Sequence, residues 1–302
     1  MDPLATTPDD ALPAAHDERP GWEGRIARGF RLARVSLEVL AGDRRLLLLP
    51  MLSAFCALLA LLADATLARR LHGGPDALRV IAPVWAAAYA VSFITIFFNV
   101  ALVHVVVGRW RGEPTRLRDG VAAARGRLAA IAGWAVLTTT VGIVLQLVER
   151  LTFGISRIVA DVAWSVASFF VVPVLVVERR GPVRALRRSA QVVREHWAEG
   201  IAGATPIALA TLMVVLPLVG LLFIGLVLYV TGLTVPGLLA MGGAGIAIVA
   251  VCIVSGAVGL VFTLAVYQHA TGGPYDDGFP AADLERPREG ALLDPLRRLR
   301  VR

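Results

Sequence analysis

Residues 201–268 read IAGATPIALATLMVVLPLVGLLFIGLVLYVTGLTVPGLLAMGGAGIAIVAVCIVSGAVGLVFTLAVYQ, without one charged side chain. A bilayer crossing needs about 20 apolar residues, whereas these 68 would extend roughly 100 Å as a single helix. The chain must therefore fold back within this segment. Glycine and proline interrupt helices, and here they cluster with threonine at Thr231, Gly232, Thr234, Pro236 and Gly237. This predicts two spans, over residues 201–230 and 238–268.

The rest of the chain has the same apolar character. Of its 302 residues 57% are hydrophobic and 18% are charged, and the mean hydropathy is +0.70. Globular proteins contain roughly 45–50% apolar and about 25% charged residues, so a water-soluble fold is excluded. We expect an all-α polytopic membrane helical bundle with six transmembrane helices. The predicted spans are residues 46–63, 80–107, 128–148, 158–177, 201–230 and 238–268.

Arginine predicts the orientation, since all 30 basic residues are arginine. The segments on one side of the membrane, which include both chain ends, carry 25 of them, and the segments on the other side carry five. Positively charged loops stay inside, so we expect a multi-pass protein of the plasma (inner) membrane with both termini in the cytoplasm. Residues 1–21 are a predicted disordered tail without a signal-peptide pattern. Residues 22–272 form the membrane domain, and residues 273–302 form an arginine-rich cytoplasmic tail.

Three cytoplasmic segments each contain an amphipathic helix that leads directly into a span. They cover residues 22–40, 117–128 and 183–197. Such helices lie in the membrane interface, with their apolar face toward acyl chains and their guanidinium groups among lipid phosphates. In the third helix Val183, Leu186, Ala190, Val193 and Trp197 form the apolar stripe. Off that stripe lie the candidate ligands of anionic lipid headgroups, Arg184, Arg187 and Arg188.

The order of these segments indicates an internal repeat. Phe97-Phe98 leads to Gly112-Glu113-Pro114 as Phe169-Phe170 leads to Arg180-Gly181-Pro182, and proline suits the first turn of a helix. The chain would then consist of three parallel units, each an interfacial helix plus a two-span hairpin, arranged around an axis along the membrane normal. The alternative is that loops on the cytoplasmic side are basic and amphipathic by default.

Polar groups inside the spans are few, and each costs about 2.5–3.5 kcal/mol to insert, so each is a candidate site. Asn99 and His104 could line a path for a substrate or a proton. The alternative, which we favour, is that Asn99 bonds a neighbouring helix and His104 sits at the headgroups. Asp161 is expected to pair with Arg157, four residues earlier, or with Arg79 across the bundle.

The last two spans contain helix-breaking and small residues. Pro206 and Pro217 predict a kinked or broken fifth span, a feature that binds substrates in transporters. The sixth span carries small residues that would let a neighbouring helix approach closely, namely Gly242, Gly243, Gly245, Ser255, Gly256 and Gly259.

Sequence motifs point away from catalysis. The chain contains no P-loop, no HExxH, no GxSxG and no carboxylate pair on one helix face. Its two cysteines, Cys56 and Cys252, form neither a zinc pattern nor a disulfide framework, and we interpret them as small buried apolar residues. We therefore expect no enzymatic activity, catalytic residue, cofactor or metal. Since membrane topology accounts for the arginines behind the pI of about 10.5, nucleic-acid binding is not expected either.

Several stretches resemble a family of uncharacterised six-span integral membrane proteins from bacteria and archaea. The resemblance covers about residues 22–272 and rests on Ser36 to Leu40 with Leu46 to Pro50, Phe97-Phe98-Asn99, Ala163 to Ala167, Phe169 to Pro173, and Gly181-Pro182 with Leu186 to Ser189. More distantly, the proline-helix-span unit and Tyr267 to Gly272 are similar to the membrane domain of some glycerophosphodiester phosphodiesterases. The resemblance implies the six-span fold. It implies no activity, because the chain lacks the catalytic phosphodiesterase domain.

Two functional hypotheses remain. The first is a non-enzymatic membrane protein that binds anionic lipid or a membrane partner through a cytoplasmic arginine-rich collar. The second is a transporter or channel for a small molecule or lipid. The amphipathic helices favour the first, and the proline-containing fifth span favours the second. The oligomeric state stays open.

Overall fold

The computed structural model describes residues 34, 36–71, 77–151 and 155–273, and these are almost entirely helical. The elements are η1 Arg44–Leu47, α2 Leu48–Leu71, α3 Ala77–Trp110, α4 Leu117–Arg125, α5 Leu128–Leu151, α6 Ile155–Ser168, α7 Val171–Val177, α8 Pro182–Val230 and α9 Thr234–Thr271. Residues 36–42, at the end of the first predicted amphipathic helix, are also helical. The predicted tail at 1–21 lies outside the described residues, as do most of that first helix and, except for Gly273, the predicted tail at 273–302.

Six segments are long and apolar enough to cross a membrane: Arg44–Thr66, Ala82–Trp110, Leu128–Gln146, Val159–Val177, Ile207–Val230 and Thr234–Thr271. The chain is therefore an all-α, multi-pass membrane protein, which confirms the predicted fold class. The fold-back inside the long uncharged run is also present. It occupies residues 231–233, where Gly232 adopts a positive φ of 94°, a conformation that glycine tolerates at no steric cost.

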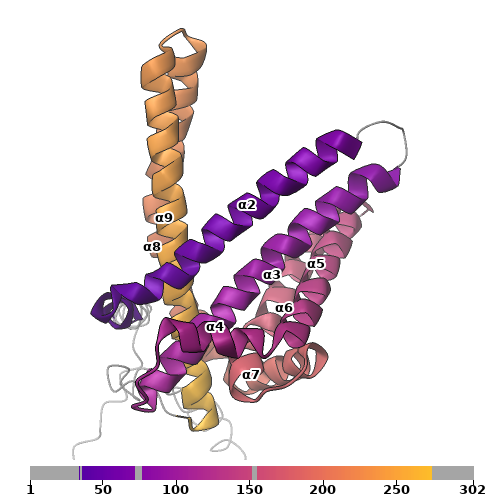
Figure 1. Ribbon diagram of the computed structural model, residues 1–302, viewed down its shortest axis with the longest axis vertical. Coiled ribbons are helices and arrows are strands. Elements are labelled where there is room, and N and C mark those ends of the chain that lie inside the picture. The colour runs from indigo at the N-terminus through magenta and orange to yellow at the C-terminus, as the bar shows by residue number, and fades with distance from the viewer. Residues whose placement is uncertain (1–33, 35, 72–76, 152–154, 274–302) are drawn as a thin grey trace, which may run out of the picture.

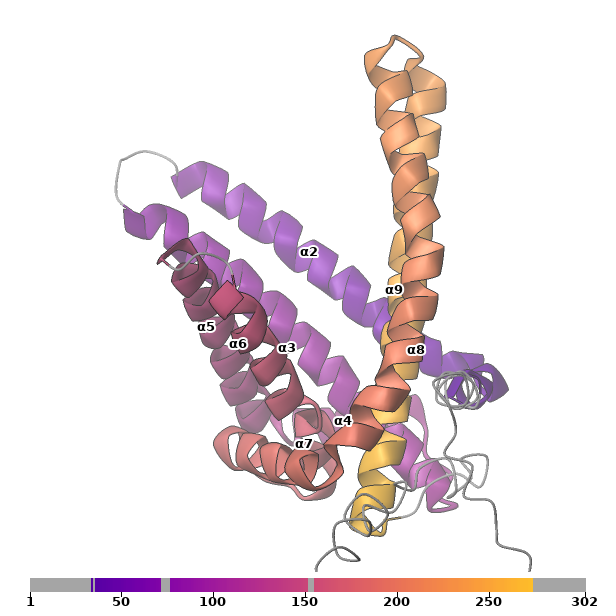
Figure 2. The same ribbon diagram turned by 180° about the vertical axis from the view of Figure 1, so that it is seen from behind.

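The helices form two arms that diverge from a common base (Figures 1 and 2). One arm contains α2, α3, α5 and α6. The other arm is the α8–α9 hairpin, which stands apart over most of its length. At the base, α4 and α7 lie across the ends of the longer helices, and the first turns of α8 run beside α7 before the helix rises next to α9.

The buried core is concentrated in this base. It consists of consecutive residues of three helices, at 100–103 and 105–107 in α3, 173–176 in α7 and 261–268 in α9. Gly120 lets α4 lie directly against α3, since a Cβ there would be 2.5 Å from the carbonyl oxygen of Ala101. Arg109 at the end of α3 pairs with Asp43, with Nη2 2.6 Å from Oδ2, and so attaches η1 to the same core.

The arms, in contrast, expose apolar side chains on most of their surface. The most apolar stretch of Ile207–Val230 contains no buried residue, and Met213 and Val230 are 69% and 75% exposed. An apolar surface of this extent is stable in hydrocarbon and not in water. The arms are thus the membrane-embedded part of the molecule.

The fourth predicted span, residues 158–177, is not one helix. It breaks at Phe169 and Phe170 into α6 and the short α7. Pro173 accounts for the break, because it has no N–H for the carbonyl of Phe169 and its ring crowds that carbonyl. The backbone N–H of Phe170 instead donates to Oγ of Ser189 at 3.0 Å, which joins the break to α8.

Two expectations for the last spans need correction. Of the two forms predicted for the fifth span, the break is wrong, because α8 continues from Pro182 through Pro206 and Pro217 to Val230, and the kink stays a prediction. The glycines of the sixth span do not admit a neighbour within the described chain, since a Cβ at any of Gly242, Gly243, Gly245, Gly256 or Gly259 would meet no atom within 4 Å.

The close approach between α8 and α9 occurs nearer the tip of the hairpin. A Cβ at Gly237 would lie 2.6 Å from the backbone N of Tyr229, and one at Gly225 would lie 2.9 Å from the backbone N of Met241. The glycines that the packing requires are therefore those beside the turn.

The order of elements follows the predicted repeat, with a helix ahead of each hairpin: 36–42 before α2–α3, α4 before α5–α6, and the start of α8 before its own span. Pro182 occupies the first turn of α8, whereas Pro114 precedes the N-cap Arg116 of α4. The hairpins do not surround an axis, because α8–α9 stands apart from the other two.

Candidate functional site

A charged cluster joins the two arms at the base. The hydroxyl of Tyr267 donates to Oε1 of Glu178 at 2.6 Å, and Nε of Arg188 donates to the same oxygen at 2.8 Å. Nε of Arg180 lies 2.5 Å from Oε2 of Glu178. We call these four residues the Glu178 cluster. It connects the end of α7, the start of α8 and the lower part of α9, with Tyr267 fully buried.

The local sequence explains why a carboxylate is placed here. Glu178 is the C-cap of the apolar helix α7, and the chain reverses at Arg179, which has a positive φ of 54°. The carbonyls at this helix end need donors. Nη1 of Arg127 donates to the carbonyl oxygen of Leu175 and, at 2.9 Å, to that of Val176. Arg127 thus fixes the end of α7, and with it the carboxylate that follows.

The electrostatics of the base are those of a partly buried ion network. Burial alone would raise the pKa of Glu178, but the hydrogen bonds from Tyr267 and Arg188 and the nearby guanidinium charges hold it below its usual value of 4.5. Burial, together with the charge of Arg179, lowers the pKa of Arg127. Glu178 is therefore ionised near neutral pH, and it is already bonded within the protein.

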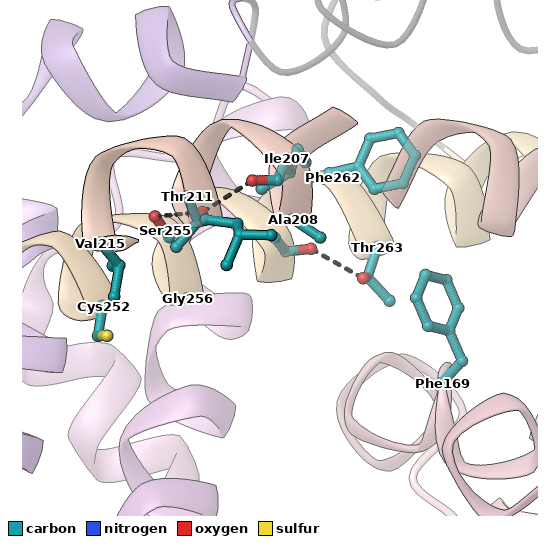
Figure 3. Close-up of a pocket in the computed structure, with 12 residues that line it drawn as sticks. Phe169, Ile207, Ala208, Thr211, Val215, Cys252, Ser255, Gly256, Phe262 and Thr263 are labelled. Carbon is teal, nitrogen blue, oxygen red and sulfur yellow. Dashed lines mark hydrogen bonds between the residues drawn. The ribbon is translucent and has the colours of Figure 1, made fainter. Parts of the chain in front are cut away.

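A groove of about 570 Å³ opens between the hairpin and the break at Phe169 (Figure 3). Its walls are mostly apolar and include Ile207 and Val215 of α8, Cys252, Gly256 and Phe262 of α9, and Phe169. Two of its hydroxyls bond protein acceptors: Oγ1 of Thr211 lies 2.7 Å from the carbonyl oxygen of Ile207 and 2.8 Å from Oγ of Ser255, and Thr263 donates to the carbonyl of Gly259 at 2.8 Å. The groove therefore presents hydrocarbon to whatever occupies it.

A family model described as "Family of unknown function (DUF6159)" matches residues 80–277. This chain belongs to that family. The matched region runs from α3 to beyond α9, so it contains both the groove and the Glu178 cluster, while η1 and α2 precede it. No curated protein and no solved structure matches the chain significantly. The family has no assigned function, and the distant similarity to phosphodiesterase membrane domains stays a prediction.

The arginines predicted to contact lipid headgroups differ in exposure and in their partners. Arg184 and Arg187 are exposed on the first turns of α8, and neither makes an ion pair with another described residue. Arg188 is more buried, with its side chain 26% exposed, and is bound to Glu178. Two of the three are thus available to an external anion, and the third has an internal acceptor.

The polar residues predicted inside the spans are not gathered into one site. Asn99 and His104 are half-buried on α3, and Asp161 is half-buried on α6. None of the three lines the groove. The side chains of Arg79 and Arg157, the partners expected for Asp161, lie outside those that the structure describes.

Glu178, Tyr267 and Arg127 were not anticipated from the sequence as parts of a site. One signal was present, because Glu178 directly follows an uninterrupted apolar run at 171–177, where a carboxylate needs a partner. Its partner Tyr267 is 89 residues away in the sequence, which no local pattern indicates. Within the described residues, no group of three or more His, Cys, Asp or Glu side chains could hold a metal ion.

Proposed function

We propose that this chain is a non-enzymatic protein of the plasma membrane that binds anionic lipid through an arginine-rich surface at the base of its two arms. The observation that carries the proposal is that Arg184 and Arg187 are exposed on the first turns of α8 and form no ion pair with another described residue. Arg179, Arg180 and Arg194 lie on or next to the same turns and are exposed as well.

The physical chemistry of guanidinium supports a phosphate ligand. Arginine binds phosphate through two parallel hydrogen bonds and is less strongly hydrated than lysine. Each basic residue near an anionic bilayer surface contributes about 1 kcal/mol to the attraction. From Glu178 to Arg194 the chain carries six arginines and one acidic residue. After the charge of Glu178 is balanced by arginine, this surface keeps a net positive charge that attracts a lipid phosphate.

The same charge distribution supports an orientation. The base carries the arginine-rich segments, and the opposite end of the α8–α9 hairpin has no charge in its turn, residues 231–237. By the positive-inside rule the base, and with it both termini, faces the cytoplasm. The headgroups bound there are those of the inner leaflet.

Catalysis and polar-solute transport have less support from the described residues. Hydrolytic chemistry needs an acid, base or nucleophile that can contact the substrate. The partly buried carboxylate of Glu178 is instead bound by a tyrosine and two arginines. A path for small polar solutes needs polar walls, and the groove between the arms is apolar. Transport therefore stays a hypothesis without a structural observation in its favour.

Native mass spectrometry in mild detergent tests the proposal. Protein reconstituted with equal amounts of phosphatidylglycerol and phosphatidylcholine should retain phosphatidylglycerol preferentially. The double variant Arg184→Gln/Arg187→Gln should lose most of that preference. Arg184→Lys/Arg187→Lys, which preserves the charge, should retain much of it. Equal retention of the two lipids by the wild-type protein would contradict the proposal.

A further inference from the structure

We propose that the groove between α8, α9 and Phe169 holds one acyl chain of an anionic phospholipid, whose phosphate lies against the arginines at the base. This inference rests on the proposed function and adds to it a specific, non-annular lipid site. According to this inference, a lipid occupies the groove, and not a second protein chain.

The size and lining of the groove fit a hydrocarbon chain. Its volume of about 570 Å³ lies within the range of roughly 300–1,000 Å³ that small-molecule sites occupy. The hydroxyls of Thr211 and Thr263 bond internal acceptors, so they do not call for a polar ligand. The ring of Phe169 lines the wall opposite the hairpin, and the ring of Phe262 projects from α9 (Figure 3).

The position of the groove relative to the charges fits a phospholipid. Its lower end is marked by Phe262 and Thr263 of α9. Tyr267 follows four residues after Thr263, which is about 6 Å along a helix, and it donates to Glu178 of the charged cluster. The apolar walls of the groove are therefore followed by guanidinium groups within one helical turn. A phospholipid has the matching order, with its acyl chains next to its phosphate.

The charge at the base favours lipid over a second copy of the chain. Copies inserted in the same membrane share one orientation, so a second copy in the opening would bring its own arginine-rich base to the same level. Like charges placed together at an interface cost several kcal/mol. An anionic headgroup at that level meets arginines instead, because Arg180 and Arg188 bind Glu178 there and the exposed Arg184 precedes Arg188 by about one turn of α8.

Two glycines of the groove wall allow a test that leaves the packing intact. Gly256 and Gly259 line the groove, and a Cβ at either would meet no atom within 4 Å. Gly256→Leu and Gly259→Leu therefore add an apolar side chain at the groove wall, and the Cβ of either clashes with no protein atom. Gly242→Leu is the matched control, because Gly242 has the same free space on the same helix but does not line the groove.

The measurement is retention of phosphatidylglycerol by the purified full-length protein in native mass spectrometry. The two groove variants should retain one phosphatidylglycerol fewer than wild type, with affinity for it lowered at least about tenfold, while Gly242→Leu behaves as wild type. Unchanged retention in the groove variants would overturn the inference, and so would an equal loss in the control. Loss of a dimer in place of a lipid would assign the groove to a second copy and also overturn it.

The sequence predicted that both cysteines are buried, but Cys56 is half-buried and Cys252 is exposed and lines the groove. Cross-linking at Cys252 therefore gives a second readout without a bulky substitution. In a Cys56→Ala background, a photoreactive maleimide on Cys252 should yield a phospholipid adduct, whereas the same reagent at Gly242→Cys, with Cys252→Ala, should yield far less. Equal adducts at both positions would overturn the inference. The proposed function is judged separately by Arg184→Gln/Arg187→Gln, which can abolish anionic preference whether or not the groove variants lose a lipid.

Discussion

At the scale of single residues, Glu178 connects three elements of the base. Its carboxylate accepts hydrogen bonds from Tyr267 of α9 and Arg188 of α8, and it pairs with Arg180. Its side chain is 18% exposed, so solvent screens these contacts only partly. Hydrogen bonds to a charged group contribute about 1.5–3 kcal/mol, more than a surface ion pair does.

We predict that Glu178→Gln lowers the free energy of unfolding by about 2 kcal/mol, because the amide cannot neutralise two guanidinium groups. Thermal unfolding in mild detergent, followed by tryptophan fluorescence, measures the change. Glu38→Gln is the control. Glu38 pairs with Arg34 where both side chains are mostly exposed, so its loss should cost no more than about 0.5 kcal/mol. Equal effects of the two substitutions would show that the cluster does not join the arms.

The pH dependence of the same comparison follows from the lowered pKa of Glu178. Above the ordinary value of 4.5 the carboxylate is charged in both folded and unfolded chains, so its stabilisation is fully present. As the pH falls below 4.5, the unfolded chain takes up the proton first and the stabilisation is lost. The difference in melting temperature between wild type and Glu178→Gln should therefore shrink in acid.

Arg188 shows which part of the site could be predicted from the sequence and which part could not. Sequence spacing places Arg184, Arg187 and Arg188 off the apolar stripe of one amphipathic helix, and all three are in the helical first turns of α8. Which of them binds an internal carboxylate depends on where α7 begins and ends: Pro173 accounts for the break before α7, and Arg127 binds the carbonyls at its end. Such a long-range arrangement leaves no local trace in the sequence.

At the scale of elements, the tip of the α8–α9 hairpin depends on backbone contact. Gly237 in the first turn of α9 lies so close to α8 that a Cβ would be 2.6 Å from the N of Tyr229 and 2.8 Å from the carbonyl oxygen of Gly225. Backbone atoms cannot move aside as a flexible side chain can. The separation of the two helices is therefore set by these glycines.

We predict that Gly237→Ala separates the helices at the tip and destabilises the protein by about 1–3 kcal/mol, the usual cost of overpacking. Gly245→Ala is the matched control on the same helix, because a Cβ there meets no atom within 4 Å. It should cause no loss of stability, since alanine is the better helix former. Both are measured by thermal unfolding in the same detergent, and similar destabilisation by the two variants would contradict the close-contact argument.

Element positions were more predictable than element pairing. Length and hydropathy locate the spans, because a membrane span must bury a fixed length of apolar chain, and the cluster of glycine, proline and threonine at 231–237 locates the fold-back. The spans are apolar on all sides, so the hydrophobic pattern does not distinguish a lipid-facing from a protein-facing side. The five glycines of the sixth span illustrate this, since their composition predicted a close approach of another helix, whereas a Cβ at any of them would meet no atom within 4 Å in the described chain.

At the scale of the whole molecule, the two arms and the charged base depend on one another. The arms expose apolar side chains that only hydrocarbon stabilises, and the base collects the arginines and the buried core. The separation of the hairpin from the first arm could not be predicted from the sequence, because α9 is apolar along its whole length, while its buried residues are concentrated in the lower part, at 257–268. The result is a molecule with an arginine-rich base, while the opposite end carries few arginines and its α8–α9 turn carries no charge.

This polarity leads to a prediction about threading. If the arginine-rich base faces the cytoplasm, Thr231 in the hairpin turn faces outward and Glu113 between α3 and α4 faces inward; both are exposed. In a Cys56→Ala/Cys252→Ala background, a membrane-impermeant maleimide added to intact cells should modify Thr231→Cys. It should modify Glu113→Cys only after permeabilisation. The reverse pattern would place the arginines on the outer surface, where the positive-inside rule does not allow them, and would remove the inner-leaflet lipid from the proposed site.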